Sequence, residues 1–339
     1  MSKVVYLMGA GASYGTRDGA TSAITSGIPV VSEIPSELSN WAKQISQYTW
    51  LEHASYNSNS FEVLLNEAQK KLSEDLDWLA KESQKHATID TFAKKLYLTK
   101  EKTKYNKLKR ALSSFFMIEQ VAHKADMRYD AFLANILTDE CKIPDDISII
   151  TWNYDSQFEI ALNTYLPRLT NMQYSPICLS WYDSSDINAR YKIFKINGSA
   201  TFSDDRPLSS FCKADEQNLL NDNLIKEILW YYGNGKLMSD LCFAWDNNVT
   251  DYFYNTLGKE VEDANTLVVI GYTFPYFNRK TDRKLFSMMK NMKNIIIQDP
   301  NAEAIVQNVE SVFPDHEALK GIDIQPEKHV GSFIIPREL

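Results

Sequence analysis

The segment Val4-Val5-Tyr6-Leu7-Met8-Gly9-Ala10-Gly11-Ala12-Ser13 indicates the fold class, because a short apolar run breaks abruptly into two glycines separated by one small residue. The run Val4 to Met8 has the composition of a buried strand. The glycines let the backbone approach a ligand closely, with amides free to donate hydrogen bonds, as in a turn that holds a dinucleotide pyrophosphate. The alternative is a purely structural turn, because such turns also occur in proteins that bind no nucleotide.

Three more polar motifs each follow another β-like run. They are Thr151-Trp152-Asn153-Tyr154-Asp155, Asn197-Gly198-Ser199 and Gly271-Tyr272-Thr273. The carboxyl ends of parallel strands lie along one edge of an open sheet, so these motifs are expected to converge with the first turn on one crevice. The expected strands are Val4 to Met8, Ile147 to Trp152, Tyr191 to Ile196, Thr266 to Ile270 and Asn294 to Gln298.

Helical periods begin where strands end, as in Asp155 to Leu166 and Asn301 to Val312. This alternation predicts an α/β fold with a Rossmann-like doubly wound parallel sheet. From about residue 35 to 143 the pattern is helical only, and a further helical piece lies between about 204 and 262. We therefore expect a single domain over residues 1–339 that carries an inserted helical layer or subdomain.

Composition narrows the class of protein. The formal net charge of −8 argues against nucleic acid as the primary ligand. The four cysteines are widely separated and lack the Cys-x-x-Cys spacing of structural zinc sites, so no metal is expected; they are Cys141, Cys178, Cys212 and Cys242. Neither a charged leader with an apolar segment nor a run of about 20 apolar residues is present. We expect a cytoplasmic protein that does not enter a membrane.

Asn153 and Asp155 are the first candidates for chemistry. One residue separates them directly after a predicted strand, so both side chains can project from the strand-to-helix turn toward the crevice. The Asn153 carboxamide must satisfy both its carbonyl and its amide, and a ribose or an ordered water suits it. Asp155 is either a binding residue or the N-cap of the following helix, for which aspartate is well suited.

Taken in order, the four motifs resemble the sirtuin-like family of NAD-binding proteins, whose segments read Gly-Ala-Gly-x-Ser, Thr-x-Asn-x-Asp, His-Gly and Gly-Thr/Tyr-Ser. The inserted helices are similar to those of the prokaryotic, zinc-free branch, which includes anti-phage defence NADases. The resemblance implies that NAD or ADP-ribose binds here. It also implies that Gly9, Ala10, Gly11, Ala12 and Ser13 hold the pyrophosphate and the adjacent ribose.

By the same resemblance, Asn153 orients the nicotinamide ribose and Asp155 meets the carboxamide. The segment Gly271-Tyr272-Thr273 would line the adenosine side. Asp299, just past the last predicted strand, would bind the adenosine ribose hydroxyls, as an acidic residue does in other dinucleotide folds.

The chain departs from the family at the catalytic position. Asn197 stands where active members carry a histidine general base, and asparagine does not take up a proton near neutral pH. A natural change and a substitution made to trap a ligand both fit this asparagine. The paired zinc cysteines are also missing, so protein deacylation is not expected. Among the five histidines, His123 is the candidate for a replacement base.

Two kinds of function follow. The first is NAD+ hydrolysis with release of nicotinamide by a defence-type effector, with Asn153, Asp155 and Asn197 as catalytic candidates. A general base contributes only about 10²- to 10⁴-fold, so slow turnover is compatible with Asn197. The second is a catalytically inactive NAD or ADP-ribose sensor, or an oligomeric interaction module. A second copy of the chain or a defence-system protein would then be its partner.

Overall fold

The N-terminal apolar run forms β1 (Lys3–Met8), the central strand of a parallel sheet in a computed structural model of the chain. Across the described residues this sheet has seven strands in the order β11-β10-β9-β1-β4-β6-β5. The other six are β4 (Ile147–Thr151), β5 (Cys178–Ser180), β6 (Ile193–Lys195), β9 (Ala264–Ile270), β10 (Asn294–Gln298) and β11 (Asp323–Glu327). The predicted α/β fold with a Rossmann-like parallel sheet is confirmed.

The strand order reverses at β1. This strand pairs in parallel with β4 on one side and with β9 on the other, although β9 follows β4 by more than 100 residues along the chain. Met8 lies opposite both Thr151 and Ile270, so the chain leaves these three strands at the same level. Ligands of open α/β sheets bind outside the carboxyl ends of the strands at such a reversal.

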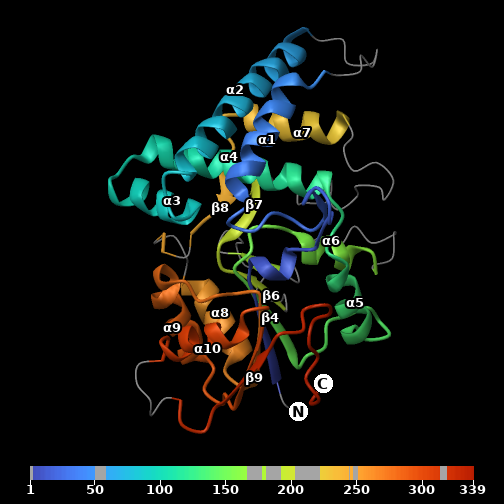
Figure 1. Cartoon of the computed structure of the whole chain (residues 1–339), viewed down its shortest axis with the longest axis vertical. Coiled ribbons are helices and arrows are strands. Elements are labelled where there is room, and N and C mark those ends of the chain that lie inside the picture. The colour runs from blue at the N-terminus through green and yellow to red at the C-terminus, as the bar shows by residue number, and fades with distance from the viewer. Residues whose placement is uncertain are drawn as a thin grey trace. The chain divides into compact units, whose positions relative to one another are not determined.

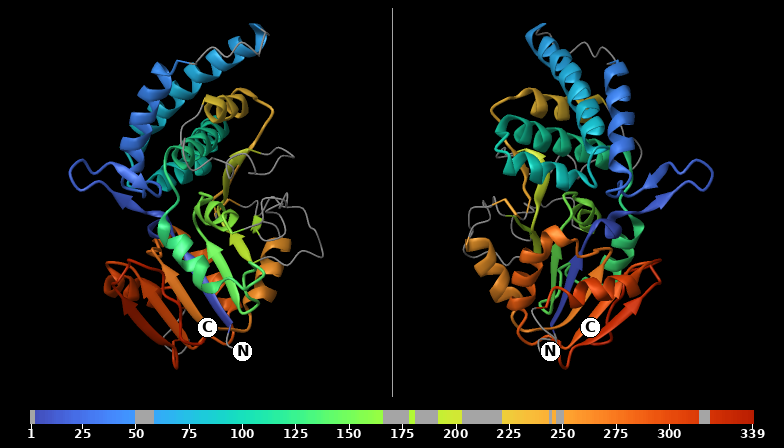
Figure 2. Two further views of the ribbon diagram at one scale, coloured as in Figure 1. Left: turned by 90° about the vertical axis from the view of Figure 1, so that its right-hand side faces the viewer. Right: turned by 60° about the vertical axis from the view of Figure 1, so that its left-hand side comes forward.

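Alternate side chains of β1 enter two apolar cores on opposite faces of the sheet, which helices cover on both sides (Figure 2). Val5 and Leu7 pack in one core with residues of α8 (Asp251–Val261), α9 (Arg279–Met288) and α10 (Ala302–Glu310). Val4, Tyr6 and Met8 pack in the other with residues of α5 (Met127–Ile136) and α6 (Gln157–Asn163). Because both faces are covered, the strand is apolar from Val4 to Met8, as its sequence indicated.

The chain divides into two compact units (Figure 1). The sheet unit comprises Met1–Gly15, Ala125–Gly198 and Cys242–Leu339, and the helical unit comprises Thr16–Lys124 and Ser199–Leu241. The inserted unit begins at Thr16, before the predicted start near residue 35. Its first segment ends at Lys124, before the predicted end near residue 143, because α5 packs in the sheet unit. The structure describes residues 3–49, 59–165, 178–180, 192–202, 222–243, 245–246, 251–313 and 319–339.

The helical unit contains α1 (Ile34–Gln47), α2 (Asn59–Ser83), α3 (Ile89–Leu98), α4 (Lys102–Ala122) and α7 (Asp222–Gly233). It also holds the hairpin of β2 (Thr16–Arg17) and β3 (Ile24–Ser26), and the strand β8 (Ser239–Leu241), which pairs with β7 (Gly198–Phe202). Arg110 of α4 donates hydrogen bonds to carbonyls at the C-terminal end of α7, including that of Asn234. Buried Glu119 accepts a hydrogen bond from Trp41 Nε1 (2.7 Å).

The sequence missed two edge strands of the main sheet, β5 and β11. β5 has three residues, and β11 reads Asp-Ile-Gln-Pro-Glu, a polar pattern that edge strands tolerate because one side faces solvent. The helices predicted over 155–166 and 301–312 are shorter, over Gln157–Asn163 and Ala302–Glu310. Much of the predicted 204–262 piece, and Cys212, lie outside the described residues. No described helix is long and apolar enough to span a membrane.

Candidate functional site

The predicted site residues all lie at the carboxyl edge of the sheet, at the ends of neighbouring strands. Asp299, Gly271, Gly9, Asn153 and Asn197 follow β10, β9, β1, β4 and β6 respectively, within two residues of each strand end. Backbone hydrogen bonds continue between these strands just past their ends, as from Gly9 N to Ile270 O (2.9 Å) and from Trp152 N to Met8 O (2.9 Å). The motifs therefore meet at the reversal of strand order.

The three glycines of the first and last motifs are required by the protein's own backbone. Gly271 has a positive φ of +60°, and a Cβ there would lie 2.4 Å from Gly11 Cα. A Cβ on Gly11 would lie 2.7 Å from Gly271 Cα, and one on Gly9 would lie 2.6 Å from Gly271 O. The turns after β1 and β9 are thus in direct backbone contact, and the structural alternative for these glycines has a physical basis.

Most amides of the glycine-rich turn are already used. The turn forms a short 3₁₀ helix, Ala10–Ser13, and the N–H groups of Gly9, Gly11 and Ala12 donate to Ile270 O, Gly271 O and Gly9 O. The prediction that the amides are free to donate is therefore wrong for these three. The Ala10 N–H has no hydrogen-bond acceptor among the described residues.

A buried hydroxyl joins the first two motifs. Ser13 Oγ lies 3.1 Å from Asn153 Nδ2, 3.2 Å from Asp155 Oδ1 and 2.9 Å from the Tyr129 hydroxyl. Its single proton goes to Asp155, so it accepts from the other two and is fully satisfied. Tyr129 of α5 was not singled out from the sequence, because a tyrosine on an apolar helix face reads as core packing.

Asn153 is held in one orientation by this network. Its Nδ2 donates to Gly9 O (2.9 Å) as well as to Ser13 Oγ, so both amide protons are used inside the protein. Its Oδ1 receives no hydrogen bond from the described residues. Asn153 therefore presents an acceptor, with its donors committed to the first turn.

Asp155 is buried beneath the edge of the sheet, with 4% of its surface exposed. Its Oδ1 also accepts from the N–H of Gln157 (2.9 Å), the first residue of α6, so part of the predicted capping role is present. Its Oδ2 has no partner among the described residues. Burial raises the pKa of Asp155 to about 6, against the opposing effect of the nearby Lys195.

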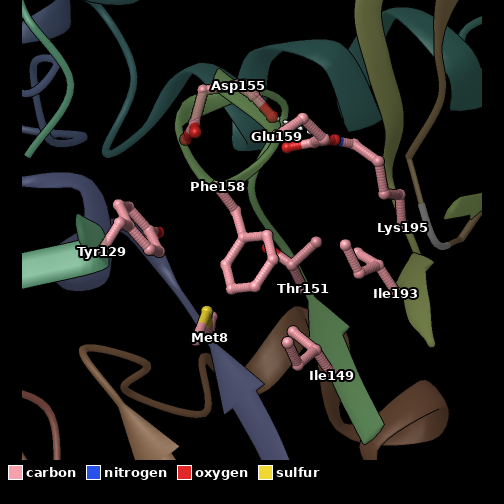
Figure 3. A pocket seen from close by; sticks show the side chains of 9 residues that line it. All are labelled: Met8, Tyr129, Ile149, Thr151, Asp155, Phe158, Glu159, Ile193 and Lys195. Atoms are coloured by element: carbon pink, nitrogen blue, oxygen red, sulfur yellow. Dashed lines mark hydrogen bonds and ion pairs between the residues drawn. The ribbon is translucent and has the colours of Figure 1, made fainter. Parts of the chain in front are cut away.

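A cavity of about 10 Å³ lies next to Asp155 (Figure 3). Lys195 Nζ contacts Glu159 Oε1 and the Asp155 carbonyl, both at 2.6 Å, and Phe158 points from α6 toward the strands. The lining residues are Met8, Tyr129, Ile149, Thr151, Asp155, Phe158, Glu159, Ile193 and Lys195. This space suits one water molecule, whereas ligand pockets have roughly 300–1,000 Å³. A dinucleotide would therefore lie outside it, along the edge.

The remaining predicted residues divide by exposure. Tyr272 is buried: its ring stacks on Trp152 at 5.2 Å, and its hydroxyl donates to Asp282 (3.0 Å), so its side chain belongs to the core. Thr273 is exposed, and Asp299 is half-buried with its Oδ1 accepting from the N–H of Asn301 (2.8 Å). Of these three, Thr273 and Asp299 have side chains that a ligand at the edge can reach.

Asn197 is fixed by hydrogen bonds to the backbone of two neighbouring segments. Its Nδ2 donates to Trp152 O (2.8 Å), its carbonyl accepts from Cys242 N (2.9 Å), and 7% of its surface is exposed. His123, the candidate replacement base, belongs to the helical unit, where its Nδ1 lies 3.0 Å from Glu119 Oε2. No group of three histidine, cysteine or acidic side chains in the described part of the chain could hold a metal ion.

No family model matches the chain, and a comparison with curated proteins found no match. The likeness to sirtuin-like proteins therefore remains a prediction carried by the four motifs.

Substituting Gly11 with alanine should lower stability, because the new methyl group would meet the Gly271 backbone at 2.7 Å. Overpacking of this kind costs roughly 1–3 kcal/mol, so we expect the melting temperature to fall by several degrees. Gly19→Ala is the matched control, because nothing lies within 4 Å of a Cβ there. Equal melting temperatures for the two variants would contradict the backbone contact.

Asp155 should make stability depend on pH in the acidic range. Its pKa is about 6 when folded and 3.8 as the ordinary value, so the folded state holds the proton more tightly and loses stability as pH rises through this interval. Relative to Asp155→Asn, the wild-type free energy of unfolding should fall by on the order of 2–3 kcal/mol between about pH 4 and pH 7. Urea unfolding at several pH values measures this difference, and a constant difference would contradict the shifted pKa.

Proposed function

We propose that the chain is a cytoplasmic NAD-binding protein of the sirtuin-like type that hydrolyses NAD+ to nicotinamide and ADP-ribose. The observation that carries the proposal is the orientation of Asn153 at the reversal of strand order. Its amide protons are committed to Gly9 O and Ser13 Oγ, and its Oδ1 has no partner among the described residues. An acceptor held in this way suits a hydroxyl of the nicotinamide ribose.

The rest of the edge supports a dinucleotide that runs along it. The Ala10 N–H, without an acceptor among the described residues, suits a phosphate oxygen, and Thr273 and Asp299 follow the two strands beyond β1. The Asp299 carboxylate can accept from ribose hydroxyls. Asp155 orients Ser13 from beneath the edge, and because its Oδ2 is buried, it would act on the ligand through Ser13 and Asn153.

Hydrolysis at this edge relies on positioning. The bond between the ribose C1′ and the nicotinamide nitrogen breaks, nicotinamide leaves with the bonding electrons, and water adds to C1′ and releases its proton to solvent. Fixing the ribose through Asn153 Oδ1 aligns the bond that breaks. The transition state carries positive charge on the ribose, which the Asn153 carbonyl dipole stabilises without acting as a base.

One observation favours a second function, a catalytically inactive NAD or ADP-ribose sensor. Asn197, at the position of the family's catalytic histidine, uses its side chain to hold Trp152 O and is nearly buried. A side chain in that role fixes the local backbone and does not take a proton from water. In this case binding would have to favour one of two conformations or assemblies, with a second copy or a defence-system protein as partner.

Replacing Asn153 with alanine separates these functions. If the protein is a hydrolase, nicotinamide release should fall by about 100-fold or more while NAD affinity changes far less, because Asn153 positions the reacting ribose. Chromatography of nicotinamide measures turnover, and calorimetry measures binding. Asn294→Ala is the control, since that side chain donates to Thr266 Oγ1 (3.4 Å) at the start of β10, away from the carboxyl edge.

The outcomes distinguish the proposals. Wild-type protein that binds NAD and releases no nicotinamide would be the sensor. Turnover by Asn153→Ala at the wild-type rate would put the chemistry elsewhere, and no binding heat at millimolar NAD would remove both functions.

A further inference from the structure

Arg128 lies outside the four motifs and donates hydrogen bonds to backbone carbonyl groups of the glycine-rich turn. Arg128, the second residue of α5, donates from Nη2 to Gly11 O (2.8 Å) and to Ala12 O (3.3 Å). Nothing in the sequence singles out Arg128, because a charged residue near the start of a helix is usually a solvated surface group. In the structure its side chain is 15% exposed.

Arg128 is itself fixed on three other sides. Its Nε donates to Asp126 Oδ2 (3.0 Å), its Nη1 donates to Val330 O (3.2 Å), and its guanidinium lies 5.0 Å from the centre of the Phe333 ring. Asp126 Oδ2 also accepts from Gly15 N (2.7 Å). The pair Asp126 and Arg128 therefore holds the turn at both ends, from Gly11 to Gly15.

This arrangement has an electrostatic consequence for an anion at the turn. A peptide carbonyl that points toward a pyrophosphate repels it, whereas a carbonyl bound to a guanidinium has its negative end turned toward that cation. Asp126 balances much of the guanidinium charge, so the main effect of Arg128 is on the direction of the Gly11 and Ala12 peptide groups. No contact of Arg128 with a ligand is required.

We propose that Arg128 is the positioning residue of the dinucleotide site, which sets the backbone of Gly11 and Ala12 for the pyrophosphate. This inference rests on the proposed function. Lysine cannot replace it, because the planar guanidinium meets acceptors in three directions at once, at Gly11, Asp126 and Val330. An ammonium group is a single point of charge and lacks this fork.

The test compares Arg128→Lys with Arg283→Lys in the full chain, using ADP-ribose as the probe. Arg283 also lies in the sheet unit and also holds backbone carbonyls, with its Nε donating to Val312 O (2.9 Å), but at the end of α10. Both variants should melt at lower temperature than the wild type. Arg128→Lys should weaken ADP-ribose binding by about tenfold or more, because a misplaced turn misplaces the phosphates.

A spectroscopic measurement separates positioning from loss of stability. The ³¹P resonances of bound ADP-ribose should move in saturated Arg128→Lys and stay at their wild-type positions in Arg283→Lys. Phe333→Leu removes the ring beside the guanidinium, keeps an apolar side chain, and should shift the same resonances by less. If Arg128→Lys does not fold, the ³¹P resonances of ADP-ribose bound to Phe333→Leu provide the measurement.

Two results would overturn the proposal in different ways. If Arg128→Lys, or Phe333→Leu in its place, keeps wild-type affinity and ³¹P resonances, Arg128 stabilises the fold and does not position the site. If wild-type protein does not bind ADP-ribose at millimolar concentration, the proposed function fails, and the positioning role fails with it.

Discussion

The contact between the turn after β1 and the turn after β9 determines how the whole edge is built. Gly11 and Gly271 approach so closely that neither tolerates a Cβ, and Gly271 needs a positive φ as well. β1 and β9 are the strands at which the order reverses, so this contact joins the two strand ends beside which ligands of open α/β sheets bind. In the proposed site a dinucleotide would lie along the surface of this edge.

The contact between the two turns also decides which polar groups of the edge are left unpaired. The N–H groups of Gly9, Gly11 and Ala12 and the hydroxyl of Ser13 are satisfied within the protein. The acceptor of Asn153 and the N–H of Ala10 have no partner among the described residues. The hydrogen-bonded groups of the network fix the positions of these two unpaired groups. The proposed site is therefore preformed, and ligand binding would lose little conformational entropy in ordering it.

Strong local patterns made the fold predictable. Five strands of the main sheet could be read from the sequence, because apolar runs covered on both faces contrast sharply with the glycines and polar residues that end them. The edge strands β5 and β11 were missed, since one is very short and the other is polar. The motif residues at the sheet edge were also predictable, because strand ends in a parallel sheet share one side.

The sequence did not indicate in which direction side chains point or which residues distant in the chain they contact. The motif Gly271-Tyr272-Thr273 predicts a turn at the sheet edge, but it does not indicate that the Tyr272 ring stacks on Trp152 in the core. The amides of the first turn were expected to be free, and their acceptors come partly from a strand end more than 250 residues away. Tyr129 and Arg128 reach the turn from α5, and nothing in their local sequence indicates the hydrogen bonds that they make with residues 11 to 13.

The proposed site requires that a phosphate of the dinucleotide binds at the Ala10 amide. An NMR titration of alanine-labelled (¹⁵N) full-length protein with ADP-ribose tests it directly. We expect the Ala10 amide resonance to shift saturably, while that of Ala264, buried at the start of β9 and away from the carboxyl edge, does not. Binding detected by calorimetry with an unchanged Ala10 resonance would contradict the account.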